Sequence, residues 1–131
     1  MPVFRPVGEH GLLVEFGDRI SSEIHERVLA LDRLLEATPF AGFREAVPAY
    51  AALLIRFDPL VTDHASVQRA AEALLHAPAM PAAPSRLREV AVCYDDDLAP
   101  DLPAVARQSG LTREQVIATH LAGEYSVFMY G

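Results

Sequence analysis

The stretch GLLVEFGDRISSEIHERVLALDRLLEA, residues 11–37, predicts a strand that leads into a helix. Its first part has the alternation of a half-buried strand, carried by Leu12, Val14 and Phe16. Gly17-Asp18 then supplies the chemistry of a turn. Beyond the turn, apolar residues recur at helical spacing, at Ile24, Val28, Leu31 and Leu35. A helix is therefore expected from Ser21 to about Ala37, with Ser21 or Ser22 as its N-cap.

Two more strands are expected between residues 43 and 57. They run from Phe43 to Val47 and from Tyr50 to Phe57. Pro48 separates them, because proline cannot donate a hydrogen bond to a central ladder. The second of these strands is rich in aliphatic side chains and is expected to be the more deeply buried one.

A second helix is expected after Asp58-Pro59 ends that strand. Thr62 or Asp63 can cap this helix, which ends at Pro78. Its buried stripe contains small residues, which imply close packing on a sheet: Val67, Ala70, Ala71 and Leu74. Residues 1–77 therefore predict an α+β fold, a small two-layer α/β N-terminal domain.

A proline-rich segment follows this domain. The sequence APAMPAAPS, residues 77–85, contains three prolines in nine residues and shows neither a helical nor a strand period. Such composition is typical of a linker. Residues 78–85 are therefore expected to be a Pro/Ala linker, and residues 86–131 to begin a second domain.

The second domain is expected to contain two strands around a pair of helices. Strands are predicted from Leu87 to Tyr94 and from Glu124 to Tyr130. The second of these strands has aromatic residues on both faces. Between them, Asp101 is expected to cap a short helix that Gly110 terminates. The next helix has a predicted capping box (Thr112 with Gln115) and hydrophobic staple (Leu111 with Val116), and ends at Gly123. Two strands cannot close a β domain, so we expect this domain to be incomplete and its apolar strand edge near residues 127–129 to be exposed.

Composition restricts the classes of function. The formal net charge is −7 over 131 residues, which disfavours binding to nucleic acid or to an anionic membrane surface. The single cysteine, Cys93, cannot form an internal disulfide and is expected to pack as a small apolar side chain. Neither a signal sequence nor an apolar run of about 18 residues is present. The expected location is the cytoplasm.

Few residues carry recognisable chemistry. The five histidines, at positions 10, 25, 64, 76 and 120, lack the spacing of a metal site, and no metal is expected. The sequence has no glycine-rich phosphate loop. The acidic run Asp95 to Asp97 is interpreted as a solvated loop in preference to a cation site. Cys93 has no neighbouring base that would make it a nucleophile.

His120 is the one candidate site residue. It lies at the margin of a helix's apolar stripe, and as a single residue it is either a partly buried, hydrogen-bonded histidine or a catalytic acid or base. The same helix pair has the spacing of a DNA-binding helix-turn-helix, with Ala106, Gly110 and Val116 at the key positions. Arg113 is offset by Glu114, so the phosphate contacts that DNA binding needs are largely missing.

Three stretches together resemble one family. They are FRPVG with GLLVEFG (residues 4–8 and 11–17), EAVPAYAALLIRFDP (residues 45–59), and DLPAVARQSGLTREQVIATH followed by YSVFMYG (residues 101–120 and 125–131). The family is that of the 5-oxoprolinase B subunit, also known as allophanate hydrolase subunit 1 or kinase A inhibitor. The resemblance spans nearly the whole chain.

The resemblance implies an α+β N-terminal domain, a linker and a cyclophilin-like β-barrel. In the family, the strand that here reaches Gly131 continues into the rest of the barrel, so the second domain is expected to be incomplete. The implied activity is an ATP-dependent amide hydrolase that opens 5-oxoproline to glutamate. It would work with a homologous partner subunit of similar barrel fold and a third hydrolase subunit, and this chain alone is expected to be inactive.

The family has other branches. Related domains are fused to urea-processing biotin enzymes, and another branch is a non-catalytic binding module that inhibits a sensor histidine kinase. ATP would be bound by the assembled complex. From the family's site, only His120 carries over as a candidate catalytic residue.

Overall fold

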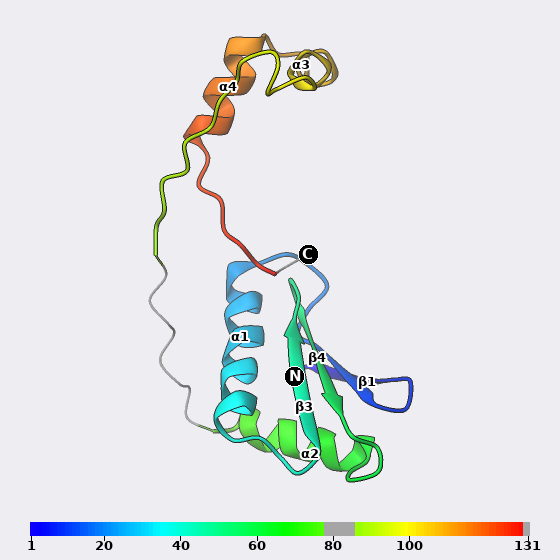
Figure 1. Ribbon diagram of the computed structural model, residues 1–131. Helices are drawn as coiled ribbons and strands as arrows, with labels where there is room; N and C mark the ends of the chain where they lie inside the picture. The colour runs from blue at the N-terminus through cyan, green and yellow to red at the C-terminus, as the bar shows by residue number, and fades with distance from the viewer. Residues whose placement is uncertain (78–85, 130–131) are drawn as a thin grey trace. The chain divides into compact units, whose positions relative to one another are not determined.

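A four-stranded antiparallel sheet organises the first part of the chain (Figure 1). Its strands are β1 (Val3–Val7), β2 (Gly11–Glu15), β3 (Phe43–Pro48) and β4 (Ala52–Phe57). Their order in the sheet is β1-β2-β4-β3. The computed structural model describes residues 1–77 and 86–129. These residues divide into two units, of which the first contains residues 1–77 with 127–129 and the second contains residues 86–126.

The register of the sheet gathers the predicted apolar positions on one face. Leu12 lies opposite Ile55, and Val14 lies opposite Leu53. All four side chains are at most 1% exposed. Because successive side chains of a strand point to opposite faces, the alternation in the sequence becomes one buried face and one open face.

Two helices cover the buried face and complete the core. Helix α1 (Ser22–Ala37) buries the predicted stripe of Val28, Leu31 and Leu35, and α2 (His64–Leu75) buries Val67 and Ala71. The Asp63 carboxylate accepts from the Ser66 N–H at 2.7 Å, which confirms one of the two expected caps of α2. The predicted α+β class is confirmed.

The open face of the sheet carries paired charges. Arg5 of β1 pairs with Glu15 of β2, and Arg56 of β4 pairs with Glu45 of β3. Pro48 is tolerated because β3 lies at an edge of the sheet, where one side of the strand needs no ladder hydrogen bonds.

The second unit contains the predicted helix pair. Helix α3 (Leu102–Ser109) ends at Gly110, whose φ of 69° is the left-handed conformation that favours glycine. Helix α4 (Arg113–Ala122) begins with the predicted capping box, in which Thr112 and Gln115 exchange side-chain and backbone hydrogen bonds. Asp101 stands at the N-cap of α3 but makes no side-chain capping bond.

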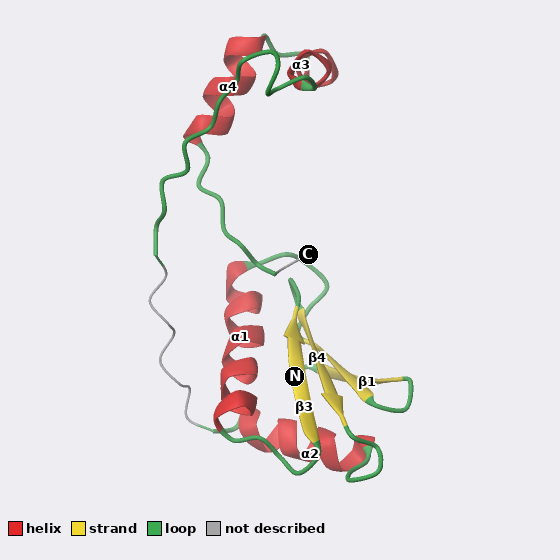
Figure 2. Cartoon of the chain, viewed as in Figure 1, coloured by secondary structure: helices red, strands yellow, loops and turns green. Residues whose placement is uncertain are grey.

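Neither predicted strand of the second domain forms in the described residues. Residues 86–94 and 124–129 run as irregular backbone, drawn green in Figure 2. A strand needs a neighbour to satisfy its backbone N–H and C=O groups, and these two segments do not pair with each other. The prediction for Cys93 is also wrong, since its side chain is exposed. The linker, residues 78–85, and the end of the last strand lie outside the described residues.

Residues 127–129 group with the first unit. The Phe128 ring lies 4.5 Å from the His25 ring and 5.7 Å from the Tyr50 ring, between ring centroids. Val127 is 81% exposed, as expected of this apolar segment, whereas Phe128 is partly covered. The exposure predicted for the segment thus holds for Val127 and not for Phe128.

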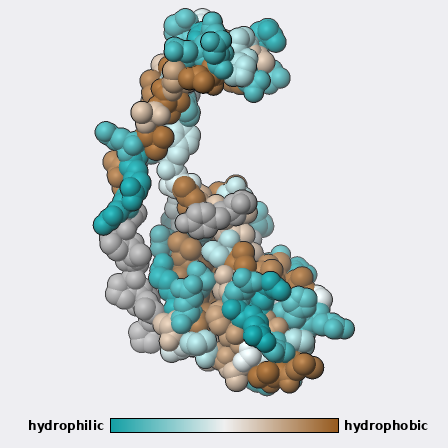
Figure 3. Space-filling model, viewed as in Figure 1, coloured by the Kyte–Doolittle hydropathy of each residue, from teal (hydrophilic) through white to brown (hydrophobic). Residues whose placement is uncertain are grey.

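The surface of the first unit mixes polar and apolar patches. An apolar patch covers the loop between β4 and α2, brown in Figure 3, where Leu60 is 94% exposed. Over residues 1–77 and 86–129, no helix has the length and apolar character needed to cross a membrane.

Candidate functional site

His120 lies in the last turn of α4, on a helix whose start is fixed by its capping box. Side chains four residues apart share one helix face, so His120 lies on the same face of α4 as Val116. Its side chain is exposed. His120 therefore has the hydrogen bond expected of the structural alternative, to Tyr94, but not its partial burial.

Two tyrosines flank the His120 ring. The Tyr94 hydroxyl lies 2.5 Å from Nδ1 of His120, and the two rings meet edge to face at 89° with centroids 5.9 Å apart. On the other side, the Tyr125 ring centroid lies 5.2 Å from that of His120. The Tyr125 hydroxyl donates to the carbonyl oxygen of His120 at 3.0 Å. The segments before α3 and after α4 thus meet at this histidine.

Arg113 ties the segment that carries Tyr94 to the start of α4. Its Nη2 donates to the backbone carbonyl of Tyr94 at 2.5 Å, and its Nη1 pairs with the Asp96 carboxylate. The hydrogen bond to Asp96 raises the pKa of the Arg113 guanidinium. Because Arg113 makes these contacts, it is not free to bind a phosphate, which weakens the helix-turn-helix interpretation further.

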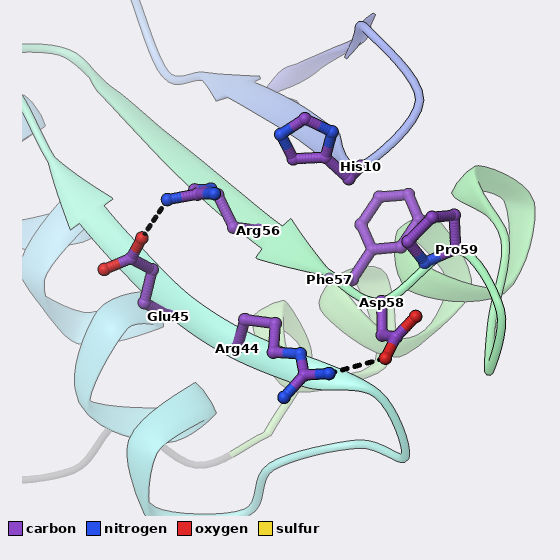
Figure 4. A pocket seen from close by; sticks show the side chains of 7 residues that line it. All are labelled: His10, Arg44, Glu45, Arg56, Phe57, Asp58 and Pro59. Carbon is purple, nitrogen blue, oxygen red and sulfur yellow. Dashed lines mark hydrogen bonds and ion pairs between the residues drawn. The ribbon is translucent and has the colours of Figure 1, made fainter.

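A second group of polar side chains lines an open pocket of about 480 Å³ in the first unit (Figure 4). It lies where β3 and β4 meet the turn between β1 and β2, and the residues that line it are His10, Arg44, Glu45, Arg56, Phe57, Asp58 and Pro59. Figure 4 shows that each arginine faces an acidic partner, at 2.5 Å for Arg44 and Asp58 and 2.6 Å for Arg56 and Glu45.

Local contacts hold Asp58 ionised in this pocket. The Leu60 N–H and then the Arg44 guanidinium lower the pKa of the Asp58 carboxyl. With both arginines neutralised, the pocket offers hydrogen bonds but no strong net charge. Sequence reasoning missed this pocket because its residues come together only through the register of β3 with β4 and the β1–β2 turn.

The remaining histidines occupy separate places. His25 is 7% exposed, and its Nδ1 lies 3.2 Å from the carbonyl oxygen of Ala49. His64 sits edge-on to Phe57 with Nε2 3.1 Å from the carbonyl oxygen of Gly11. Both contacts indicate structural roles. Within the described parts of the chain, no three His, Cys, Asp or Glu side chains gather as a metal site would require.

The fold and the helix pair define the class of this protein. The family model of the carboxyltransferase domain, subdomain C and D, matches residues 2–131, and the chain belongs to that family. Within this class, the chain is 32% identical over 136 residues to the B subunit of 5-oxoprolinase from Bacillus subtilis (strain 168). The relationship to the 5-oxoprolinase B-subunit family predicted from the sequence is confirmed.

Solved structures support the same relationship. The chain in the crystal structure of TTHA0988 is 35% identical in sequence to this chain, with a TM-score of 0.74. The match covers 92% of this chain and 23% of the TTHA0988 chain. The conserved uncharacterized protein PH0987 from Pyrococcus horikoshii is 29% identical in sequence, with a TM-score of 0.53. The match covers 90% of this chain and 54% of the PH0987 chain. The B. subtilis protein is matched over 95% of this chain and 57% of its own length. The chain therefore spans little more than half of that curated relative.

Proposed function

We propose that this chain is part of a subunit of an ATP-dependent 5-oxoprolinase, which opens 5-oxoproline to glutamate. The observation that carries the proposal is the 32% identity to the B subunit of a 5-oxoprolinase over 95% of this chain. Because that relative is a subunit and is longer than this chain, the activity belongs to an assembly and not to these 131 residues alone.

His120 is the residue of this chain that we assign to the reaction. Opening a lactam places negative charge on the amide carbonyl oxygen as the carbonyl carbon is attacked, and a positioned donor nearby stabilises that charge. An exposed imidazole held between two tyrosines is suited to reach a substrate bound against it.

ATP is assigned to the assembled complex. Arg44 and Arg56, the two arginines of the open pocket, each pair with a carboxylate, so that pocket has no strong positive charge to attract a phosphate. The sequence also lacks a glycine-rich loop that would bind phosphates through backbone N–H groups. We therefore assign the nucleotide site to the assembled complex and not to this chain alone.

The proposed partners are a homologous subunit with a similar barrel and a third hydrolase subunit, acting in the cytoplasm. Val127 is 81% and Met129 is 40% exposed, and apolar side chains presented together favour burial against another polypeptide segment. This segment begins two residues after Tyr125, so an interface there would lie close in sequence to the proposed site.

The test is 5-oxoproline-dependent ADP release by the protein that carries this chain, mixed with its candidate partner subunits and repeated with each component omitted. We expect turnover that disappears when this protein is left out. Undiminished turnover without it would contradict the proposal. If no combination turns over, direct binding to a sensor histidine kinase would be measured next, because the resemblance also implies an inhibitory binding module.

A further inference from the structure

The two ring nitrogens of His120 have different surroundings. Nδ1 lies 2.5 Å from the Tyr94 hydroxyl. Nε2 makes no hydrogen bond to any residue in the part of the chain that the structure describes, and the side chain is exposed. Nδ1 is thus occupied within the protein, while Nε2 is the nitrogen that a ligand can reach.

The chemistry of the two groups sets the direction of the Tyr94 hydrogen bond. A phenol is a good O–H donor and a weak acceptor, because its oxygen lone pairs are delocalised into the ring. An unprotonated imidazole nitrogen is a strong acceptor. The favoured arrangement therefore has the Tyr94 O–H donating to Nδ1, which leaves the single proton of neutral His120 on Nε2.

The position of Tyr94 is fixed by contacts on its backbone. Arg113 donates to the Tyr94 carbonyl at 2.5 Å and pairs with Asp96 two residues further on. Arg113 is the first residue of α4, the same helix that carries His120. The phenol and the imidazole are thus held by one helix, as a preorganised pair requires.

We infer that Tyr94 is a positioning residue that keeps neutral His120 as the Nε2–H tautomer. His120 then acts through Nε2–H as a hydrogen-bond donor to a carbonyl or phosphoryl oxygen that gains negative charge, and not as a base that removes a proton. This assignment rests on the proposed function for its substrate, but the tautomer itself does not depend on it.

The first test measures the tautomer without any activity. In ¹⁵N NMR spectra of this chain at pH 8, Nδ1 of His120 should resonate as an unprotonated nitrogen and Nε2 as a protonated one. In Tyr94→Phe, both shifts should move toward those of the exposed His76 in the same spectra, because the donor to Nδ1 is lost. A proton on Nδ1 in the wild type, or unchanged shifts in Tyr94→Phe, would overturn the inference.

The second test separates a donor from a base in the reconstituted enzyme. Glutamine places an amide N–H near the position of Nε2 but cannot accept a proton as imidazole does. His120→Gln should therefore retain kcat within about tenfold of wild type, whereas His120→Ala should lose a factor on the order of 10² to 10³. Equal losses in the two variants would identify a base and refute the donor role.

Tyr94→Phe provides the matched measurement on the positioning residue. We expect kcat to fall about tenfold, which corresponds to about 1.4 kcal/mol, with KM unchanged. If the wild-type complex shows no turnover, the proposed function fails while the NMR result still decides the tautomer. An unchanged kcat in an active complex would show that Tyr94 does not position His120 for the reaction.

Discussion

Replacing Ile55 by alanine should destabilise the first unit far more than the same change at its neighbour Leu54. Both changes delete three carbons, but Ile55 is 0% exposed in the core while Leu54 is half-buried on the open face of the sheet. At about 0.8 kcal/mol per buried carbon, Ile55→Ala loses about 2.4 kcal/mol of transfer free energy before any cavity cost. The expected loss in free energy of unfolding is therefore about 3 kcal/mol, within the usual range for such changes.

Leu54→Ala is the matched control on the same strand. Because its side chain keeps part of its surface in water, we expect a loss of about 1 kcal/mol. Urea denaturation followed by the NMR amide signals of residues 11–15 and 52–57 reports on this unit alone, which matters because the chain has two units. With a slope of about 1.5 kcal/mol per molar urea, the midpoints should fall by about 2 M and 0.7 M.

A variant with a smaller deletion keeps the test informative if Ile55→Ala does not fold. Ile55→Val removes one carbon and should cost about 1 kcal/mol. Equal losses in the two alanine variants, or a larger loss for Leu54→Ala, would show that the assignment of buried and open faces is wrong. The register of β2 with β4 would then have to be shifted by one residue.

Two further predictions concern single side chains. Burial, then the nearby Glu36 charge, raise the pKa of the Asp32 carboxyl, and its Oδ1 has no hydrogen-bond partner among the described residues. Because the Asp32 pKa is raised in the folded state, the stability of the wild-type protein falls as pH rises above the pKa of the unfolded state, near 3.8. Asp32→Asn should therefore be more stable than wild type at pH 7 and lose that advantage at pH 3 in thermal unfolding. An equal difference at both pH values would contradict this. Thr112→Ala should destabilise the second unit by about 1 kcal/mol through loss of the capping box, measured by amide hydrogen exchange in α4. Thr112→Ser should stay near wild type in the same measurement. Unchanged exchange in α4 of Thr112→Ala would refute that role of the cap.

Local patterns in the sequence were sufficient for most of the first unit. The alternation at Leu12 and Val14 and the helical spacing from Ile24 to Leu35 each report on a face that one element must bury, so they predict both the element and its orientation. The capping box at Thr112 is equally local, since both partners lie within one helical turn. These features needed no knowledge of the tertiary fold.

The features that sequence reasoning missed are non-local. Tyr94 lies 26 residues before His120, and no local pattern links a tyrosine to a histidine at that separation. The contact of Phe128 with His25 joins still more distant positions. The strands predicted over residues 87–94 and 124–130 failed for the same reason, because alternation predicts a face but cannot supply the neighbouring strand.

The role of this protein as a 5-oxoprolinase subunit is tested by the amount of glutamate formed from 5-oxoproline. The complex is reconstituted with wild-type protein, with the His120→Ala variant, and without this protein. We expect glutamate formation that depends on ATP, disappears when this protein is omitted, and is reduced by a factor on the order of 10² or more in His120→Ala. Glutamate formation at the full rate without this protein would contradict its assignment as a 5-oxoprolinase subunit. A full rate in His120→Ala would contradict the assignment of the site.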